Sequence, residues 1–564
     1  MYKCIAPNRR DENMELTRPN KSVAGRSSVL LILSLVLLIS CGGGGDNNNP
    51  PPVDIEPVKV SGTPTFGGLR LFDAFAWAPD SSRVAYIARQ ASNSQELYSS
   101  TPDGTVNSAV APVPLPSGGN VFSFVWSPDL SVTDRIAYLA EQTTLNIDEL
   151  YSSAPDGSDN QNRSGVLVAG GFVLDSYDWA LSTLDPDTLV FRARKEDATV
   201  IELFASFDNG VSIIKLSDTM TPGGNVLDFA VSPDGRTVAY LADQDVDGTD
   251  ELYTVPINGG FVVNISQLAP ANRPNVLEFK WAPNGTRIAY RAKDLFTGLT
   301  GGNTVLFTND PSGNSLADVS IAPSLGQNVR EFAWSPDSLQ LAYTANVSGF
   351  SEQLDLFTTS PISSINIKLT SSLPNFTDVN NIAWSPNSLL IAYLADVRLI
   401  DVNELFVADP ANPPVGAPVP ISGTLITGGQ VIDYAWSPDS ALIAYRADQF
   451  VDEQFELFTG TPIGNRLPIL ISQLTLGGSD VIDFAWSPDL GVSNRIAYVA
   501  DQDTVGVFEL YSASPNGSSS VNISGGLTAG EEVIDFAWAP DATLIAYQSN
   551  QDDITKYELY TTLP

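Results

Sequence analysis

Apolar and polar residues alternate along this chain in short blocks that recur about every 50 residues. The clearest copy reads VIDFAWSPD at 481–489 and continues with RIAY at 495–498. The tryptophan of this block recurs at the same position, called the tryptophan slot, in nine copies, and a tenth copy has Val231 there. Such internal repetition indicates a repeat architecture, and it sets the size of the repeating unit. All nine tryptophans of the chain occupy this slot: Trp77, Trp126, Trp179, Trp281, Trp334, Trp384, Trp436, Trp486 and Trp538.

Each copy contains four such blocks. The tryptophan block is followed by Ile-Ala-Tyr, as at 136–138, then by Glu-Leu-Tyr, as at 251–253, and by Val-Asn-Ile-Ser, as at 521–524. These blocks are rich in aromatic and β-branched residues, which favours strands. Ser-Pro-Asp separates the first two blocks, and Pro-Asp-Gly or Pro-Asn-Gly separates the last two; both sequences are typical of tight turns. Four antiparallel strands per repeat of this size predict an all-β fold, a β-propeller of ten four-stranded blades.

The two ends of the repeat region complement each other. The last copy stops after its third block, at 558–560, and residues 58–62 (Val-Lys-Val-Ser-Gly) match the fourth block at 521–525. We therefore expect the N-terminal strand to complete the last blade and to remove the exposed sheet edges. Ten copies form either one ring of ten blades or two rings of five. The uniform spacing, without a linker between copies five and six, favours one ring.

Residues 1–40 have the features of an export signal. Basic residues precede an apolar stretch at 29–39, which is too short to span a bilayer comfortably. Residues 1–13 look superfluous, because Met14 would start a signal of ordinary length. The stretch ends Leu-Ile-Ser-Cys41, which resembles the lipobox of bacterial lipoproteins. The alternative is an ordinary signal peptide with an incidental cysteine.

The lipobox resemblance implies that Cys41 becomes the acylated N-terminus and that the membrane is a partner through this lipid. Residues 41–57 would then form a Gly-, Asn- and Pro-rich tether before the propeller at 58–564. Gly42 after the cysteine resembles the outer-membrane sorting pattern, which implies an outer-membrane lipoprotein of the bacterial cell envelope, facing the periplasm or the exterior. Without Cys4, which precedes the cleavage site, the exported chain has a single cysteine and no internal disulfide.

The combination Phe-Ala-Trp-Ser-Pro-Asp, Ile-Ala-Tyr and Glu-Leu-Tyr resembles the WD40-like (PD40) repeat of TolB-type propellers. The resemblance covers residues 58–564. It departs from TolB in having more repeats and in lacking the N-terminal α/β domain of that protein. It therefore implies the propeller fold, and the partners of TolB do not carry over.

The charge of the chain excludes some partners. Removal of residues 1–40, with six basic and three acidic residues, leaves 23 basic and 62 acidic residues, a net charge of −39. So negative a chain is not expected to bind nucleic acid or anionic lipid as its main ligand. The charge permits a basic partner, a cation or simple solubility. Histidine is absent, which removes the usual general base and the commonest zinc ligand.

Acidic residues recur at three places that antiparallel pairing brings to one end of each blade. The second strand ends in Asp, as at Asp243, and the third begins with Glu, as at Glu96. The first strand would place its acids beside the central channel. Both the third-strand Glu and the first-strand acids have a structural alternative, as acceptors for nearby backbone N–H groups. The candidate acidic channel face consists of Asp228, Glu278, Glu331, Asp433, Asp483 and Asp535.

One loop suggests a cation. Asp243, Asp245 and Asp247, followed by Gly248, resemble the opening of an EF-hand calcium loop. The acidic residue expected at the twelfth position is absent, because Thr254 stands there, and no helices flank the loop. Ca²⁺ is thus the one cofactor that the sequence suggests, and none is required.

Two copies depart from the repeat by gaining basic residues, which mark either an asymmetric contact surface or drift. In copy three these are Arg192, Arg194 and Lys195, and in copy five Lys280, Arg287, Arg291 and Lys293.

Three functions fit these observations. The first is an envelope scaffold that binds a protein or glycan, with or without a cation. The second is a lyase or hydrolase that uses channel carboxylates, and the third is a structural envelope protein. The absence of histidine and the regularity of the acids favour a binding protein over an enzyme.

Overall fold

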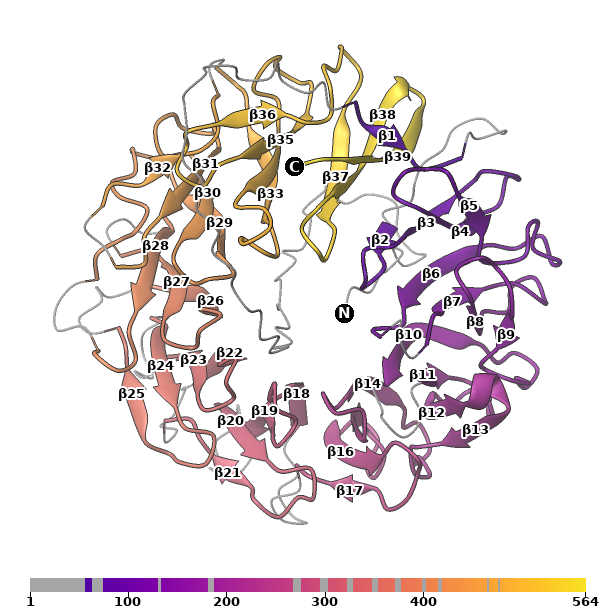
Figure 1. Ribbon diagram of the computed structural model, residues 1–564. Helices are drawn as coiled ribbons and strands as arrows, with labels where there is room; N and C mark the ends of the chain where they lie inside the picture. Colours follow the sequence, from indigo (N-terminus) through magenta and orange to yellow (C-terminus); the bar gives the residue numbers. More distant parts are fainter. Residues whose placement is uncertain are drawn as a thin grey trace, which may run out of the picture.

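The computed structural model describes residues 56–62, 75–129, 133–180, 187–266, 275–294, 303–321, 328–346, 353–370, 377–397, 402–413, 418–463, 466–474 and 477–564. These residues form ten antiparallel sheets arranged around one ring (Figure 1). Nine sheets have four strands, and the described part of blade 7 has three. The prediction of a ten-bladed propeller is confirmed, and the single ring excludes the alternative of two five-bladed rings.

The blades are numbered in chain order, and in each the first strand lies nearest the ring axis (Figure 1). Blade 1 comprises β2 (Phe75–Trp77), β3 (Val84–Ala88), β4 (Glu96–Ser100) and β5 (Asn107–Ala109), and blade 2 comprises β6 (Val121–Trp126), β7 (Ile136–Ala140), β8 (Glu149–Ser153) and β9 (Gln161–Asn162). Blade 3 comprises β10 (Val173–Ala180), β11 (Thr188–Ala193), β12 (Glu202–Phe207), the 3₁₀ turn η1 (Asp208–Gly210) and β13 (Ser212–Lys215). Blade 4 comprises β14 (Val226–Val231), β15 (Thr237–Ala242), β16 (Glu251–Pro256) and β17 (Val263–Asn264), and blade 5 comprises β18 (Asn275–Trp281), β19 (Ile288–Asp294), β20 (Asn303–Asn309) and β21 (Ala317–Asp318).

Blades 6 to 10 continue the pattern. Blade 6 comprises β22 (Val329–Trp334), β23 (Leu341–Ala345), β24 (Asp355–Thr359) and β25 (Asn366–Lys368), and blade 7 comprises β26 (Val379–Trp384), β27 (Ile391–Ala395) and β28 (Glu404–Ala408). Blade 8 comprises β29 (Val431–Trp436), β30 (Ile443–Ala447), β31 (Glu456–Gly460) and β32 (Ile469–Leu470), and blade 9 comprises β33 (Val481–Trp486), β34 (Ile496–Ala500), β35 (Glu509–Ala513) and β36 (Ser520–Asn522). Blade 10 comprises β37 (Val533–Trp538), β38 (Ile545–Asp553) and β39 (Lys556–Thr562), with β1 (Val58–Lys59) as its outer strand.

The N-terminal strand closes the ring as predicted. Strand β1 pairs antiparallel with β39, with Val58 opposite Thr561 and Lys59 opposite Tyr560 (Figure 1). The pairing continues past the strand, because the Val60 N–H donates to the Leu559 carbonyl at 2.9 Å. Lys59 also forms an ion pair with Glu558 at 2.5 Å. The two ends of the repeat region therefore share one sheet.

The hydrophobic core lies between neighbouring blades. Inner strands present large side chains to the blade on each side, so every core cluster combines residues of two adjacent blades. Within each blade, one aromatic ring of the second strand stacks on one ring of the third, as Tyr86 does on Tyr98 with 5.8 Å between centroids. Ten such stacks, one per blade, occur among the described residues.

The tryptophans join nine of the ten blades to the preceding blade. Every indole Nε1 donates to a carbonyl of the preceding inner strand, at 3.0–3.2 Å. Trp77 of blade 1 donates to the Ala537 carbonyl of blade 10, so the pattern crosses the closure. On the outer side, Thr561 Oγ1 of blade 10 donates to the Pro102 carbonyl of blade 1 at 2.6 Å. The predicted core role of tryptophan is confirmed, and its bond between blades is an additional finding.

The Ser-Pro-Asp turns are as predicted, because the aspartate accepts the N–H two residues later. Asp80 Oδ1, for example, accepts from Ser82 N at 2.9 Å. The residue between them is left-handed, with φ of 64° at Ser81, a conformation that Gly235 adopts without strain in blade 4. Ser81 Oγ in turn accepts the Asp541 N–H of the neighbouring turn at 3.0 Å. The turns thus share in holding the ring together.

Some sequence predictions fall outside the described residues. These are the export signal at 1–40, the acylated Cys41 and all but the last two residues of the 41–57 tether. Where the chain is described, no helix is long and apolar enough to cross a membrane.

Candidate functional site

The acidic channel residues stand directly after a β-bulge in the inner strand. In β33 the pairing shifts register between Val481 and Asp483, and in β29 it shifts between Val431 and Asp433. A bulge bends the strand and re-aims the following side chain. The same shift precedes the other four acids of the predicted face, Asp228, Glu278, Glu331 and Asp535. The six acids therefore share one position, at the same end of the first strand, in blades 4, 5, 6, 8, 9 and 10.

Two of the six carboxylates are neutralised by arginine from the second strand. Arg291 Nε lies 2.5 Å from Glu278 Oε1, and Arg446 Nε lies 3.0 Å from Asp433 Oδ1. Each arginine also donates Nη1 to the next blade, Arg291 to the Val329 carbonyl at 2.9 Å and Arg446 to the Val481 carbonyl at 3.0 Å. These acids thus orient arginines that connect blades, a structural role that differs from the expected acceptance of backbone N–H groups.

Three other carboxylates remain at the channel surface. Asp228 and Asp483 are exposed, and Asp535 is half-buried. Each accepts the N–H of its following residue, at 2.9, 2.8 and 2.9 Å. A local bond of this kind limits the rotation of the side chain. These residues can therefore present negative charge to a ligand at the mouth of the channel.

Glu331 differs from the other five. Its Oε1 is buried and has no hydrogen-bond partner, and burial raises the pKa of Glu331 to about 7. Lys280, Glu278 and Arg291 of blade 5 act on it electrostatically. Lys280 Nζ is itself held by the Phe332 carbonyl at 3.0 Å. The channel wall at blades 5 and 6 thus combines acidic and basic groups and contains one carboxyl that titrates near neutral pH.

The second-strand acids are structural. Asp243 accepts Asn225 N at 2.6 Å with Oδ1 and Gly248 N at 3.0 Å with Oδ2. Asp501 does the same for Asp480 N and Gly506 N, at 2.6 and 2.7 Å. One carboxylate therefore ties the segment before the first strand to the loop before the third. Sequence spacing could not reveal this role, because the two segments belong to different parts of the repeat.

The same contacts bear on the predicted calcium loop. Both oxygens of Asp243 are taken by backbone N–H groups, while Asp245 and Asp247 are exposed. Over the described ranges, no group of three or more acidic, Cys or His side chains could hold a metal ion. The calcium site stays a prediction, without support from this arrangement.

The third-strand acids are mostly buried and have a structural role, as the structural alternative proposed. Glu509 Oε2 accepts from the Tyr511 hydroxyl at 2.7 Å, and its Oε1 accepts from Asn522 Nδ2 at 2.8 Å. In two blades without this tyrosine, a lysine of the fourth strand pairs with the acid: Lys215 with Glu202 at 2.9 Å and Lys368 with Asp355 at 2.9 Å. The actual partners are mainly these side chains, together with some backbone N–H groups of the kind expected.

Most of the basic departures are used inside the ring. Arg192 donates Nη1 to the Val226 carbonyl at 3.2 Å, across the one blade boundary where Val231 replaces tryptophan. Lys195 donates Nζ to the carbonyls of Ser164 and Val166, at 2.9 and 2.8 Å. These contacts give copy three a structural reason for its basic residues. In copies five and eight the sequence offers a clue to such contacts, an arginine 13 residues after the acidic position, in Glu278–Arg291 and Asp433–Arg446.

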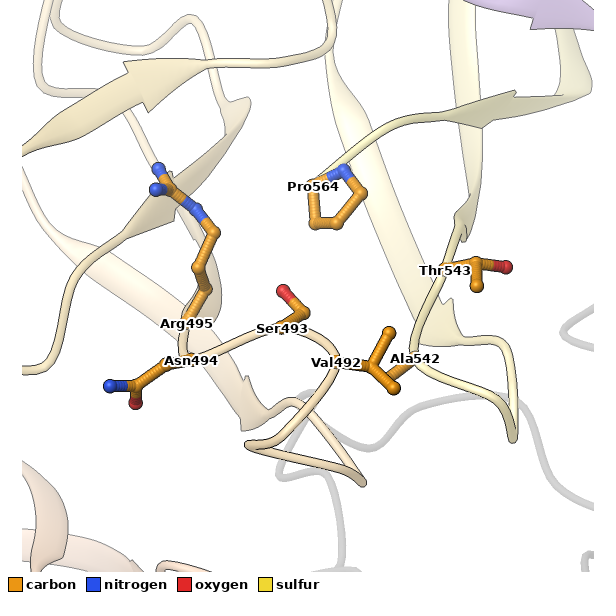
Figure 2. Close-up of a pocket in the computed structure, with 7 residues that line it drawn as sticks. All are labelled: Val492, Ser493, Asn494, Arg495, Ala542, Thr543 and Pro564. Atoms are coloured by element: carbon orange, nitrogen blue, oxygen red, sulfur yellow. The ribbon is translucent and has the colours of Figure 1, made fainter. Parts of the chain in front are cut away.

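A hollow of about 520 Å³ lies between blades 9 and 10 on the side of the Ser-Pro-Asp turns. Figure 2 shows the Ser493 hydroxyl directed into the space between Arg495 and Pro564, while the Asn494 side chain points away. Burial lowers the pKa of the Arg495 guanidinium, which stays charged. Sequence reasoning did not single out this place. Its lining consists of Val492, Ser493, Asn494, Arg495, Ala542, Thr543 and Pro564.

No protein-family model and no curated protein matches this chain. Solved structures match at low similarity. A prolyl endopeptidase is 14% identical with a TM-score of 0.35, over 69% of this chain and 56% of its own length. The GH74 enzyme of Niastella koreensis is 12% identical with a TM-score of 0.31, over 86% and 71% of the two chains.

An oligogalacturonate lyase in complex with manganese is 13% identical to this chain, with a TM-score of 0.32, over 59% of this chain and 88% of its own length. At such identities and TM-scores, these likenesses assign neither a substrate nor an activity to this chain.

Proposed function

We propose that this protein is a lipid-anchored, PD40-type propeller of the bacterial cell envelope that binds a partner at the acidic mouth of its channel. The observation that supports the proposal is the exposure of Asp228 and Asp483 and the partial exposure of Asp535 on first strands, which lie nearest the ring axis. Clustered carboxylates attract cationic groups. Between the two partner classes expected from the sequence, a protein and a glycan, the charge favours a basic protein segment.

The anchor is the second part of the proposal. Strand β1 begins at Val58, so the proposed 41–57 tether would join the propeller at the outer strand of blade 10. Metabolic labelling with a fatty acid tests it. Label is expected on the wild-type protein and not on Cys41→Ser, whereas an unlabelled wild-type chain would remove the anchor and leave the channel proposal standing.

A charge-neutralising triple variant tests the channel. A decalysine peptide should bind the full-length protein at low salt and more weakly at about 0.15 M salt. Asp228→Asn, Asp483→Asn and Asp535→Asn together should weaken binding about tenfold or more, because three interfacial charges are lost. The matched control makes Asp103→Asn, Asp234→Asn and Asp541→Asn in the turns. Asn already occupies the same turn slot at Asn284, Asn387 and Asn516, so this control should bind like the wild type.

Equal loss of binding in both triple variants would show a nonspecific effect of net charge and would contradict the channel site. Failure of decalysine to bind, combined with binding of an envelope glycan, would replace the basic protein segment with the glycan as partner.

One observation favours the alternative of an enzyme. The Glu331 carboxyl titrates near neutral pH, beside Lys280 and Arg291, which suits a general acid or base. The test is a screen of envelope polysaccharides for new reducing ends or unsaturated products. Product formation by the wild type, lost in Glu331→Gln, would establish the enzyme. Equal turnover by both proteins would exclude Glu331 from that role.

A further inference from the structure

Blades 2 and 9 are a matched pair within the ring. Their first hairpins are closely similar, SPDLSVTDR at 127–135 and SPDLGVSNR at 487–495. Each ends in an arginine, Arg135 or Arg495, that lies against the third strand of its own blade. Arg135 Nε donates to Ser152 Oγ at 3.0 Å and Arg495 Nε donates to Ser512 Oγ. The two guanidinium groups therefore start from the same anchoring contact.

The outer edge of Arg135 is occupied by an acidic residue. Arg135 Nη1 lies 2.7 Å from Asp159 Oδ2, and Nη2 donates to the Asp159 carbonyl at 2.7 Å. Nη2 also donates to the Ser152 carbonyl at 3.0 Å. Blade 2 thus shows how this scaffold satisfies the Nη1–Nη2 edge of the arginine, with one carboxylate and one carbonyl.

Blade 9 keeps the arginine and lacks this partner. Ser519 occupies the position of Asp159, and its carbonyl accepts Ser514 N at 2.9 Å. Asn494 replaces the second nearby acid, Asp134. Arg495 Nη2 donates to the Ser512 carbonyl at 2.7 Å, and among the described residues Nη1 has no hydrogen-bond partner and the guanidinium has no ion pair. A cation with an open edge therefore remains in an otherwise strongly acidic protein.

Arg495 also lines the hollow of Figure 2. The Ser493 hydroxyl points into the same space, and Val492, Ala542 and Pro564 provide an apolar wall. Cationic, hydroxyl and apolar groups thus converge at one place, a composition suited to an organic acid.

We propose that the hollow between blades 9 and 10 binds a carboxylate-bearing ligand, whose carboxylate takes on Arg495 the place that Asp159 holds on Arg135. The pairing is a charge-assisted fork across Nη1 and Nη2, and the Ser493 hydroxyl donates to the bound acid. This site lies on the turn side of the ring, opposite the acidic mouth, and is independent of the function proposed above. An acidic sugar or an aspartyl side chain can supply the carboxylate.

Calorimetric titration of the full-length protein tests the site, with glucuronate and N-acetylaspartate amide as probes and glucose as the neutral control. At about 0.15 M salt we expect saturable binding of a carboxylate probe and none of glucose. The tighter-binding probe identifies the source of the acid. Arg495→Gln should weaken binding about tenfold or more, and Ser493→Asp should do so independently by placing a carboxylate in the hollow. The matched control Arg135→Gln should bind like the wild type.

Several outcomes would overturn the proposal. These are the absence of binding by either acid, binding of glucose as tight as that of glucuronate, and an Arg135→Gln effect as large as that of Arg495→Gln. If Arg495→Gln fails to fold, Ser493→Asp decides alone, since undiminished binding by a folded Ser493→Asp protein contradicts the site.

Discussion

At the residue scale, the tryptophan slot combines two roles. The ring fills the wedge between blades, and its Nε1 satisfies a carbonyl of the preceding inner strand. Trp436 Nε1, for example, lies 3.1 Å from the Ala383 carbonyl. Phenylalanine would preserve most of the apolar area and lose the bond. The slot is therefore selective for tryptophan wherever a carbonyl of the previous blade must be paired.

Replacement of Trp436 by Phe isolates the bond. We expect a loss of about 1 kcal/mol or more, because the change leaves a carbonyl unpaired. Thermal unfolding monitors the effect, and a lowered Tm is expected. The control is Phe458→Leu, which removes a stacked ring within one blade and leaves the bonds between blades intact. An unchanged Tm in Trp436→Phe would contradict the role of the indole N–H.

Glu456 lies in a more apolar setting than Glu509. Blade 9 surrounds Glu509 with Tyr511, Asn522 and, beyond them, Asp503, whereas blade 8 has Phe458, Leu470 and Phe450 in those positions. Glu456 Oε2 is buried without a partner, and burial raises the pKa of this carboxyl to about 7.

This setting predicts that the protein loses stability as the pH rises and Glu456 ionises. The folded state binds the Glu456 proton more tightly than the unfolded state, whose pKa is near 4.5, so stability falls as pH rises from about 4.5 to about 7. Glu456→Gln should therefore raise the Tm at pH 8 and change it little at pH 5. Glu509→Gln is the matched control and should lower the Tm, because Glu509 has partners. A lower Tm of Glu456→Gln at pH 8 would contradict the account.

At this scale the sequence could place the acids but could not assign their roles. Asp243 and Asp483 look alike as acidic residues near a strand end. Asp243 is buried between two loops whose contact is set by tertiary structure, and Asp483 is exposed beside a bulge. Distant backbone donors decide between these roles, and no spacing within the repeat records them.

At the element scale, the bulged inner strand and its arginine form a connector between blades. Arg446 pairs with Asp433 of its own blade and donates to the carbonyls of Val481 and Ile482 in the next. The planar guanidinium can make these contacts together, which a lysine cannot do. The bulge exposes the carbonyls that the arginine needs.

Arg446→Lys should therefore destabilise the protein nearly as much as Arg446→Gln, by about 1–3 kcal/mol in this half-buried setting, because both remove charge-assisted bonds. Asp433→Asn should cost less, since the bonds to blade 9 remain. Urea unfolding followed by tryptophan fluorescence measures the order of the variants. Wild-type stability in Arg446→Lys would show that charge alone suffices, which the account excludes.

The elements themselves were predictable, since turn chemistry and aromatic alternation identify four strands per copy. The exceptions arise from tertiary contacts. In β26 the register shifts between Asn380 and Ala383, and Asn381 is left-handed at φ 52°. The Tyr434 hydroxyl of the next blade lies within hydrogen-bond distance of the Asn381 and Ala392 carbonyls, and most blades have phenylalanine in place of this tyrosine. The sequence shows that Tyr434 has a hydroxyl that phenylalanine lacks, but it does not show which carbonyls this hydroxyl contacts.

At the scale of the whole molecule, one ring of ten blades depends on the joining of its ends. Several contacts cross that seam, among them the pairing of β1 with β39, the Trp77 bond to Ala537, the Thr561 bond to Pro102 and the Asp541 bond to Ser81. The missing fourth strand of the last copy predicted the first of these. It could not by itself separate one ring from two, because five-bladed rings would also exchange a strand.

Disulfide trapping of the first strand tests this closure most directly. In a Cys41→Ser background, Val58→Cys with Thr561→Cys places two cysteines on directly opposed residues, within the span of a disulfide. The competing pair, Val58→Cys with Thr308→Cys, uses the equivalent residue of blade 5, where a five-bladed ring would close. We predict that oxidation gives an intramolecular disulfide in the first pair and none in the second. A disulfide in the second pair, or only intermolecular dimers in the first, would contradict the single closed ring.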